Sequence, residues 1–282
     1  MTLRIVPLSE ALGAEVAGPD WARPLDPDTL AELDRAFLEF HLLCLRAEPL
    51  DAVAFARLAR CFGEPQVQLI ASERQAEAPE VSRLETTYRS AADKPDDMRK
   101  VRLTGWHSDD SYFPVPAKAT LLQALAIPES GGQTRFANMQ AAYEDLPEAM
   151  KARVDGLRAI HRYHTRRAMA PPPELTTAER AETQDAVHPL VRVHEQTGAK
   201  AIYFNANRTD GIVGLSERDS DTLLDRLHEH TIQAKYQYHH AWRVGDILLW
   251  DNRCLIHSVD MDFPVGQRRL HQRVLLAGTP PA

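Results

Sequence analysis

Two residues in the first half of the chain have types and a spacing suited to metal binding. The stretch Trp106-His107-Ser108-Asp109 holds the one H-x-[DE] pattern formed by the twelve histidines. On an extended backbone the side chains alternate, so His107 and Asp109 would point to the same side. His257 follows an apolar segment and the cluster Trp250-Asp251-Asn252-Arg253. Together these residues predict a 2-His-1-carboxylate site, a ligand set that leaves three positions open on Fe(II).

The short motif has competing explanations. A hydrogen-bonded core histidine and a turn-forming aspartate would give the same pattern by chance. Other histidine pairs are weaker candidates for a metal site. His228 and His230 would lie on opposite sides of a helix, and His239 and His240 would lie on opposite faces of a strand. The sequence contains no H-E-x-x-H, G-x-S-x-G, phosphate-binding or dinucleotide-binding glycine motif, so it favours neither a zincin, a serine hydrolase nor a nucleotide enzyme.

Two arginines near the C-terminus indicate an anion-binding position. Arg269 and Arg273 lie in a strand predicted over 268–277, and a spacing of four residues places them on one face. Two guanidinium groups on one face, close to a metal, repel each other unless they meet anions. Arg268 beside them is predicted to be a solvated basic side chain.

Composition is that of an ordinary soluble globular protein, and its charge favours a small or local partner. The 282 residues are 44% hydrophobic and 26% charged, and the net charge of −7 argues against nucleic-acid binding. The three cysteines are odd in number and widely spaced, which favours a reducing compartment. No signal-peptide core and no apolar run of about 18 residues is present, so we expect a cytoplasmic location and no membrane partner. The oligomeric state stays open, a homo-oligomer included.

Periodicity predicts a mainly β chain with helical insertions, an α+β composition. Helices are expected over 26–40, 51–62, 138–146, 147–157 and 217–230. Strands are expected within 3–18 and over 42–45, 103–106, 119–127, 134–136, 189–193, 201–204, 232–242, 246–250, 254–258 and 268–277. This order favours a β-sandwich or jelly roll. The polar segment 71–100 is either a lid or a solvated loop, and Ala170-Pro171-Pro172-Pro173 is a loop within a single domain, 1–282.

These motifs resemble one known family, the Fe(II)/2-oxoglutarate-dependent dioxygenases of the taurine dioxygenase and chlorophenoxyacetate dioxygenase group. The resemblance rests on the H-x-D motif followed by Pro114-Val115-Pro116-Ala117, on Gly131-Gly132-Gln133-Thr134 with Phe136-Ala137-Asn138-Met139 and Ala141-Ala142-Tyr143, on Trp250-Asp251-Asn252-Arg253, on His257, and on Arg268-Arg269 with Arg273. Their order and spacing fit from Gly13-Ala14-Glu15-Val16 to the last strand, so the resemblance covers nearly the whole chain.

The resemblance implies a double-stranded β-helix (jelly roll) core with His107, Asp109 and His257 as Fe(II) ligands. Thr134 and Arg269 would bind the distal carboxylate of 2-oxoglutarate, and O2 would be the second co-substrate. Arg273 would hold the carboxylate or sulfonate of a small anionic substrate, with Asp110 and the loop around 66–104 completing the pocket. The products would be succinate, CO2 and a substrate hydroxylated at an aliphatic carbon. Asp109 implies hydroxylation rather than halogenation, because related halogenases carry a small residue there.

Two alternatives remain open on the sequence. A cupin-type metal enzyme, an isomerase or a ring-cleaving dioxygenase, would use the same fold and metal without 2-oxoglutarate and would not need Arg269. A non-catalytic relative that binds a metabolite would need no intact triad. The sequence leaves undecided which anion is the main substrate and whether the oxidation is a hydroxylation or a desaturation.

Overall fold

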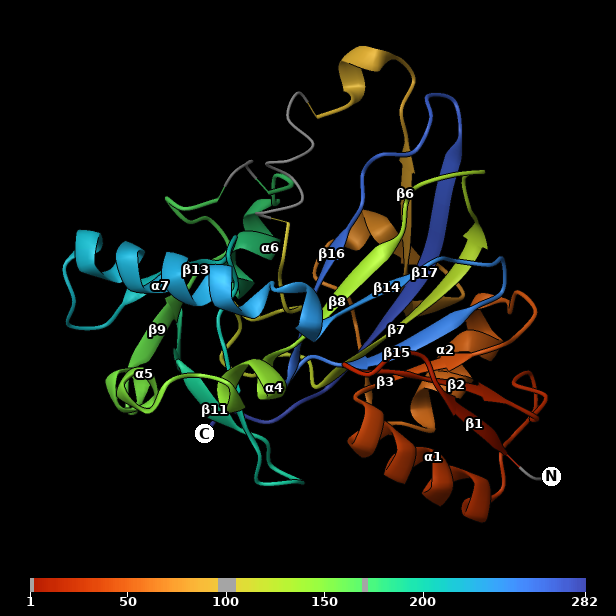
Figure 1. Ribbon diagram of the computed structural model, residues 1–282. Coiled ribbons are helices and arrows are strands. Elements are labelled where there is room, and N and C mark those ends of the chain that lie inside the picture. The colour runs from red at the N-terminus through yellow and green to blue at the C-terminus, as the bar shows by residue number, and fades with distance from the viewer. Residues whose placement is uncertain (1–2, 96–104, 169–171) are drawn as a thin grey trace.

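The computed structural model describes residues 3–95, 105–168 and 172–282 and is rich in β-structure, with the helices grouped at two sides (Figure 1). The largest sheet has nine strands in the order β1-β2-β3-β15-β7-β17-β6-β5, with β4 paired to β17. Its strands are β1 Arg4–Pro7, β2 Ala14–Ala17, β3 Leu42–Leu45, β4 Pro65–Gln66, β5 Arg74–Gln75, β6 Ala78–Thr87, β7 Ala119–Ala126, β15 Ile247–Asp251 and β17 Arg268–Leu276. All its pairings are antiparallel except that of β2 with β3.

Three smaller sheets complete the β-structure. The one that matters for the site has the order β14-β8-β16. It consists of β14 Gln237–His240, β8 Thr134–Asn138 and β16 Leu255–Val259. The other two join β10 Ala186–Pro189 to β9 Arg158–His161 and β13 Thr209–Ile212, and β11 Val191–Val193 to β12 Lys200–Ile202.

The large sheet is covered on both faces, which explains why its central strands are apolar throughout. Leu43 and Leu45 of β3 pack in the cluster beneath helices α1, Pro27–Phe40, and α2, Ala52–Arg60. Leu42 and Cys44 point the other way, into the cluster shared with Phe136 of β8. Because side chains alternate along a strand, a strand buried on both faces reads as an unbroken apolar run. Figure 1 shows α1 and α2 on the outer side of this sheet.

Helix starts follow the side-chain signals in the sequence. The Asp26 carboxylate accepts a hydrogen bond from the amide of Thr29 at the start of α1, and Asn138 caps α4, Met139–Glu144. Both caps satisfy amides that have no partner within the helix. The remaining helices are α5 Glu148–Val154, α6 Thr177–Glu182 and α7 Glu217–Thr231, with 3-10 turns η1 Ala71–Glu73, η2 Ala91–Asp93 and η3 Ala234–Tyr236.

The prediction of an irregular segment over 71–100 was wrong. Within its described part, residues 78–87 form β6, which pairs with β17 from Thr87 opposite Arg268 to Ser82 opposite Arg273. The segment lacks an apolar alternation because β6 lies near the edge of the sheet and exposes most of its far half. The strand positions are therefore set by pairing with β17, which local periodicity does not report.

Other differences are local. The strand predicted for 232–242 begins only at Gln237, because η3 follows α7 directly. The strand predicted for 103–106 falls partly outside the described residues, and Gly105 and Trp106 are not in a strand. The short strands β9 and β13 and helix α6 were not predicted.

No described helix has both the length and the apolar character needed to cross a bilayer. Cys44, Cys61 and Cys254 are free thiols.

Gly245 precedes β15 in a turn that only glycine fits, and this generates a stability prediction. Its φ is +94°, and a β-carbon there would lie 2.1 Å from the carbonyl oxygen of Ala47. We expect Gly245→Ala to lower the free energy of unfolding by about 2–4 kcal/mol, through a left-handed backbone and a clash with the main chain. Denaturant unfolding measures the change.

The matched control is Gly214→Ala, where φ is +82° and nothing lies within 4 Å of the added carbon. Its cost should be about 1 kcal/mol, from the backbone conformation alone. Equal losses in the two variants would contradict the prediction, because only Gly245 has the close contact.

Candidate active site

A backbone bridge brings the two predicted histidine ligands together. The amide of His107 donates to the carbonyl of His257 at 2.9 Å, and the amide of His257 donates to the carbonyl of His107 at 2.7 Å. Their rings lie 4.1 Å apart between centroids. Each Nε2 lies 3.9 Å from a carboxylate oxygen of Asp109. The structure therefore unites all three predicted triad residues, with one ligand atom from each within 4.8 Å of the others.

Asp109 reaches the site by a different backbone path from the one predicted. Only His107 makes a strand-like bridge, and Asp109 and Asp110 lie in a turn, with Asp110 at a φ of +55°. The side chain of Asp109 converges with the histidines because Thr120 donates to its Oδ2 at 2.7 Å. The three predicted residues therefore lie together, but the predicted strand alternation does not extend to Asp109.

Asn252 links the turn at Asp109 to the strands that contain Thr120 and Trp250, and so helps to hold the triad in place. Its side chain donates to the Thr120 hydroxyl at 2.8 Å and accepts from the indole of Trp250 at 3.0 Å. Its carbonyl accepts from Ser108 at 2.8 Å. A ligand whose partners are themselves hydrogen-bonded is held in one orientation. Thr120 was not predicted, since one threonine in an apolar strand carries no motif.

The His107 ring is also oriented by its own segment. Its Nδ1 lies 2.9 Å from the carbonyl of Gly105, which leaves Nε2 directed toward Asp109. A hydrogen bond at one ring nitrogen sets which nitrogen is free to bind a metal.

The site has the protonation states that a divalent metal requires. Burial, and then the neighbouring His107, lowers the pKa of His257 to about 3. Burial likewise lowers the pKa of His107. Burial opposes ionisation of Asp109, but His257, Arg273, His107 and the Thr120 hydrogen bond together lower the pKa of its carboxyl. Neutral imidazoles and an ionised carboxylate are the metal-binding forms of these groups.

Two other groups of possible ligands are structural clusters. Cys44, His240 and Asp246 are buried together, as are His194, Asp251 and Cys254. In each, an arginine is bonded to the carboxylate: Arg46 donates to Asp246 at 2.7 Å, and Arg253 donates to Asp251 through two nitrogens. These cations occupy the lone pairs that a metal would need. Arg273, in contrast, lies 3.6 Å from Asp109, beyond hydrogen-bonding distance.

Thr134 and Arg269, predicted as an anion-binding pair, are in contact. The guanidinium of Arg269 donates to the Thr134 hydroxyl at 3.2 Å and to the carbonyl of Gly132 at 3.0 Å, and its residue is 7% exposed. Burial lowers its pKa to about 10, so it stays charged at neutral pH. Within the described ranges no carboxylate pairs with it. A buried guanidinium without a counter-ion requires an anion from outside the protein.

This anion position lies close to the triad. Thr134 is two residues from Phe136 along β8, and Phe136 faces His257 across the sheet. Two residues of a strand span roughly 7 Å. A molecule with two acidic ends could therefore reach from Arg269 to the triad.

Arg273 and Asp110 line a cavity of about 210 Å³ that also includes His107 and Asp109, and we call it the triad cavity. Its other lining residues are Ile70, Glu73, Leu84, Ser108, Tyr112, Tyr163, Pro173, Asn205 and Arg208. Arg269 and Arg273 are predicted to lie on one face of their strand. The contact of Arg269 with Thr134 and the place of Arg273 in this cavity are consistent with that prediction. Burial, and then the charge of Asp109, raises the pKa of Asp110 to about 6.

Arg208 is a second guanidinium in this cavity that the sequence did not reveal. It lies over the ring of Tyr163 at 4.9 Å and of Tyr112 at 5.8 Å, and it donates to the Tyr163 carbonyl at 2.7 Å. Among the residues that the structure describes, no ion pair joins it to a carboxylate. Asn205-Ala206-Asn207-Arg208 precedes β13 without any motif, and β13 itself was not predicted.

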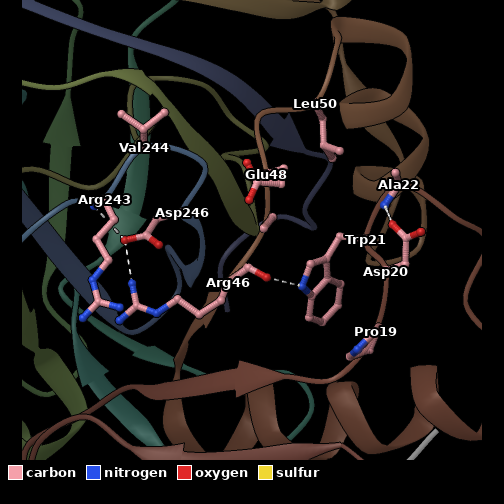
Figure 2. Close-up of a pocket in the computed structure, with 11 residues that line it drawn as sticks. Pro19, Asp20, Trp21, Ala22, Arg46, Glu48, Leu50, Arg243, Val244 and Asp246 are labelled. Carbon is pink, nitrogen blue, oxygen red and sulfur yellow. Dashed lines mark hydrogen bonds and ion pairs between the residues drawn. The ribbon is translucent and has the colours of Figure 1, made fainter.

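A larger cavity, about 430 Å³, contains none of the triad residues. Figure 2 shows its side chains, with Arg46 directed to Asp246 and the Trp21 indole donating to the Arg46 carbonyl. Arg46 also pairs with Glu15 at 2.7 Å. These polar groups are hydrogen-bonded or ion-paired with one another. Their bonds connect the loop that contains Trp21 with the ends of β3 and β15.

The chain is similar to known proteins over most of its length. The profile of the family described as "Taurine catabolism dioxygenase TauD, TfdA family" matches residues 4–275. The chain is 34% identical to the (S)-phenoxypropionate/alpha-ketoglutarate-dioxygenase of Sphingobium herbicidovorans, over 98% of this chain and 95% of the relative.

Two crystal structures are similar over nearly all of this chain. A taurine dioxygenase from Burkholderia xenovorans superposes with a TM-score of 0.84 at 29% identity, covering 99% of this chain and 91% of that one. AAD-2, solved with Mn(II) and N-oxalylglycine, gives a TM-score of 0.82 at 28% identity, covering 100% of this chain and 99% of that one.

His271 lies between Arg269 and Arg273 and generates a pH prediction. Burial lowers its pKa well below the ordinary value, and neither ring nitrogen has a hydrogen-bond partner in the described part of the chain. The unfolded chain therefore binds a proton that the folded one does not, and stability falls as the pH drops below the unfolded pKa. From about pH 7 to about pH 5 this histidine should cost about 2 kcal/mol of unfolding free energy.

The measurement is denaturant unfolding at both pH values for the wild type and His271→Leu. The variant should lose about 2 kcal/mol less than the wild type on acidification. The control is His164→Leu, which replaces an exposed histidine. An unchanged pH dependence in His271→Leu would contradict the expectation.

Proposed function

Because the chain belongs to the taurine catabolism dioxygenase TauD, TfdA family, and is thus an alpha-ketoglutarate-dependent dioxygenase, we propose that it uses Fe(II) to hydroxylate an aliphatic carbon of a small anionic substrate. 2-Oxoglutarate is consumed with O2 and gives succinate and CO2. The observation that carries the proposal is the convergence of His107, Asp109 and His257 in their metal-binding forms. A cupin-type enzyme without 2-oxoglutarate and a non-catalytic binder do not agree with the family.

The proposal extends to the architecture. The sheet β14-β8-β16 and the large sheet around β3-β15-β7-β17 enclose a shared core. We take these two layers as a double-stranded β-helix, or jelly roll, and residues 1–282 as one dioxygenase domain. The antiparallel pairings of both layers support this assignment.

His107, Asp109 and His257 are proposed as the Fe(II) ligands. Two imidazoles and one carboxylate from one side leave open positions for a chelating co-substrate and O2. Bound iron supplies the oxygen chemistry that no side chain provides. The protein holds the three ligands rigid through the His107–His257 bridge and the Thr120 hydrogen bond.

Arg269 and Thr134 are proposed to hold the distal carboxylate of 2-oxoglutarate. A buried, charged guanidinium and a hydroxyl offer donors to both oxygens of a carboxylate. Trp242 also donates to the Thr134 hydroxyl, at 3.0 Å, and fixes its position. The co-substrate then extends along β8 toward His257.

Arg273 is proposed to hold the carboxylate or sulfonate of the main substrate, with Arg208 as a second donor and Asp110 as a wall of the same cavity. Both cations face a space that contains His107 and Asp109. An anion held there keeps its neighbouring carbon close to the metal position, and orientation of this kind is a main contribution of the protein to rate.

The central test compares Arg269→Leu with Arg268→Leu. Arg268 lies next in the same strand but pairs with exposed Glu85 at 2.7 Å. Arg269→Leu should weaken 2-oxoglutarate binding at least about tenfold, from loss of a charge-assisted hydrogen bond. Arg268→Leu should leave it unchanged. Calorimetry under anaerobic Fe(II) measures both.

Turnover completes this test. Purified protein with Fe(II), ascorbate and 2-oxoglutarate should release succinate in the presence of aryloxy acids or sulfonates, and His107→Ala should not. Equal succinate release by wild type and His107→Ala would refute the metal assignment.

Arg208→Gln tests the substrate position separately. With (S)-2-phenoxypropionate as the probe, KM should rise about tenfold because one charged donor is lost. The affinity for 2-oxoglutarate should not change. Arg226→Gln, at an exposed arginine of α7, should leave both values alone. A loss of 2-oxoglutarate affinity in Arg208→Gln would show that Arg208 acts on the whole site instead.

A further inference from the structure

A second concave surface shares a wall with the triad cavity. We call it the outer groove, and its volume is about 500 Å³. Its apolar lining comes from Val67, Leu69, Phe113, Pro114 and Val115. Asp110 lines both spaces. The remaining lining residues, Gln66 and Glu182, are polar.

The wall consists of two short segments, 66–70 and 110–115, and neighbouring residues in each face different spaces. Leu69 lines the outer groove and Ile70 the triad cavity, while Phe113 lines the groove and Tyr112 the cavity. Both segments therefore lie between the two spaces, and Asp110 is the residue that lines both.

The outer groove presents apolar side chains to water. Val67 is 59% exposed and Val115 is 39% exposed. Large apolar side chains gathered on an exposed concave surface are typical of a ligand-binding region. Because the groove adjoins the triad cavity, the part of the substrate that does not fit in the cavity would lie in the groove.

Hydrogen bonds fix both sides of the wall. Buried Gln68 accepts from Arg273 through its side chain at 3.0 Å and from Arg74 through its carbonyl at 2.7 Å. On the other side, Nε2 of His188 lies 3.0 Å from the carbonyls of Ser111 and Phe113. The segment that bounds the groove is thus attached to the arginine proposed to bind the substrate anion.

The triad cavity is too small for a substrate with a sizeable apolar body. Its volume of about 210 Å³ lies below the roughly 300–1,000 Å³ typical of small-molecule sites. The lining of the outer groove is mostly apolar, so it suits an uncharged part of the substrate.

We propose, on the basis of the proposed function, that the substrate is an amphiphilic anion. Arg273 holds its anionic head in the triad cavity, and its apolar tail passes Asp110 and lies in the outer groove against Val67 and Val115. The groove thus selects substrates by the length of the tail.

The test uses the alkane-1-sulfonates from propane to octane as probes. Calorimetry measures their Kd for the full chain loaded with Mn(II) and N-oxalylglycine. In the wild type, each added methylene that enters the groove should lower Kd about threefold to fourfold. In Val67→Asp and Val115→Asp the gain per methylene should nearly vanish, while the Kd of propanesulfonate stays within about twofold.

Val53→Asp is the matched control, because Val53 is 53% exposed on α2 and lines neither space. Its chain-length dependence should equal that of the wild type. A wild-type Kd independent of chain length, an unchanged dependence in both groove variants, or no binding of any probe would overturn the inference. A groove covered by a second copy of the chain would also overturn it, seen as a loss of mass in light scattering for Val67→Asp.

The outcome is separable from that of the proposed function. If N-oxalylglycine does not bind in the presence of Mn(II), the proposed function itself fails. If it binds and Arg273→Leu weakens every sulfonate by the same factor while chain length has no effect, only the tail assignment fails.

Discussion

The paired hydrogen bonds between His107 and His257 are the constraint on which the site depends. They join residues 150 positions apart along the chain and bring two imidazoles within contact of each other. Main-chain bonds of this kind depend on the sheet and not on the side chains, so the placement of the two histidines follows from the fold. Asp109, the third residue of the triad, needs separate support, and the hydrogen bond from Thr120 supplies it.

Burial explains the electrostatic state of the whole region. It keeps the imidazoles neutral, leaves Arg269 charged with no carboxylate partner among the residues that the structure describes, and keeps His271 uncharged between two arginines. A neutral ring at His271 avoids adding a third positive charge to that face of β17. Low-dielectric surroundings make an unpaired charged group costly, and they also strengthen its bonds to an anion or a metal.

The sequence predicted the residues of the site better than the path that brings them together. His107, Asp109 and His257 were predicted from their spacing, and Arg269 and Arg273 from alternation along one strand. Thr134 and the separate roles of the two arginines were predicted only from the resemblance to a known family. Arg208 and Thr120 were not, since their roles come from strand pairings that join distant parts of the chain. For the same reason β6 was taken for a loop, because its place is set by β17 and its own side chains carry no alternation.

The link from Arg273 through Gln68 to the groove wall has a consequence for how specificity can vary. The triad is held by β16, β7 and the turn after His107, whereas the groove is bounded by two segments of five or six residues outside these strands. Exchanging those segments would redesign the set of accepted molecules while the oxidation chemistry stayed intact. Gln68 is the limit on that freedom, because a segment that lost it would also release Arg273. On the proposed assignment, the residues that hold the triad are separate from those that bound the groove, except at Asp110, which shares a turn with Asp109, and at Gln68, which binds Arg273.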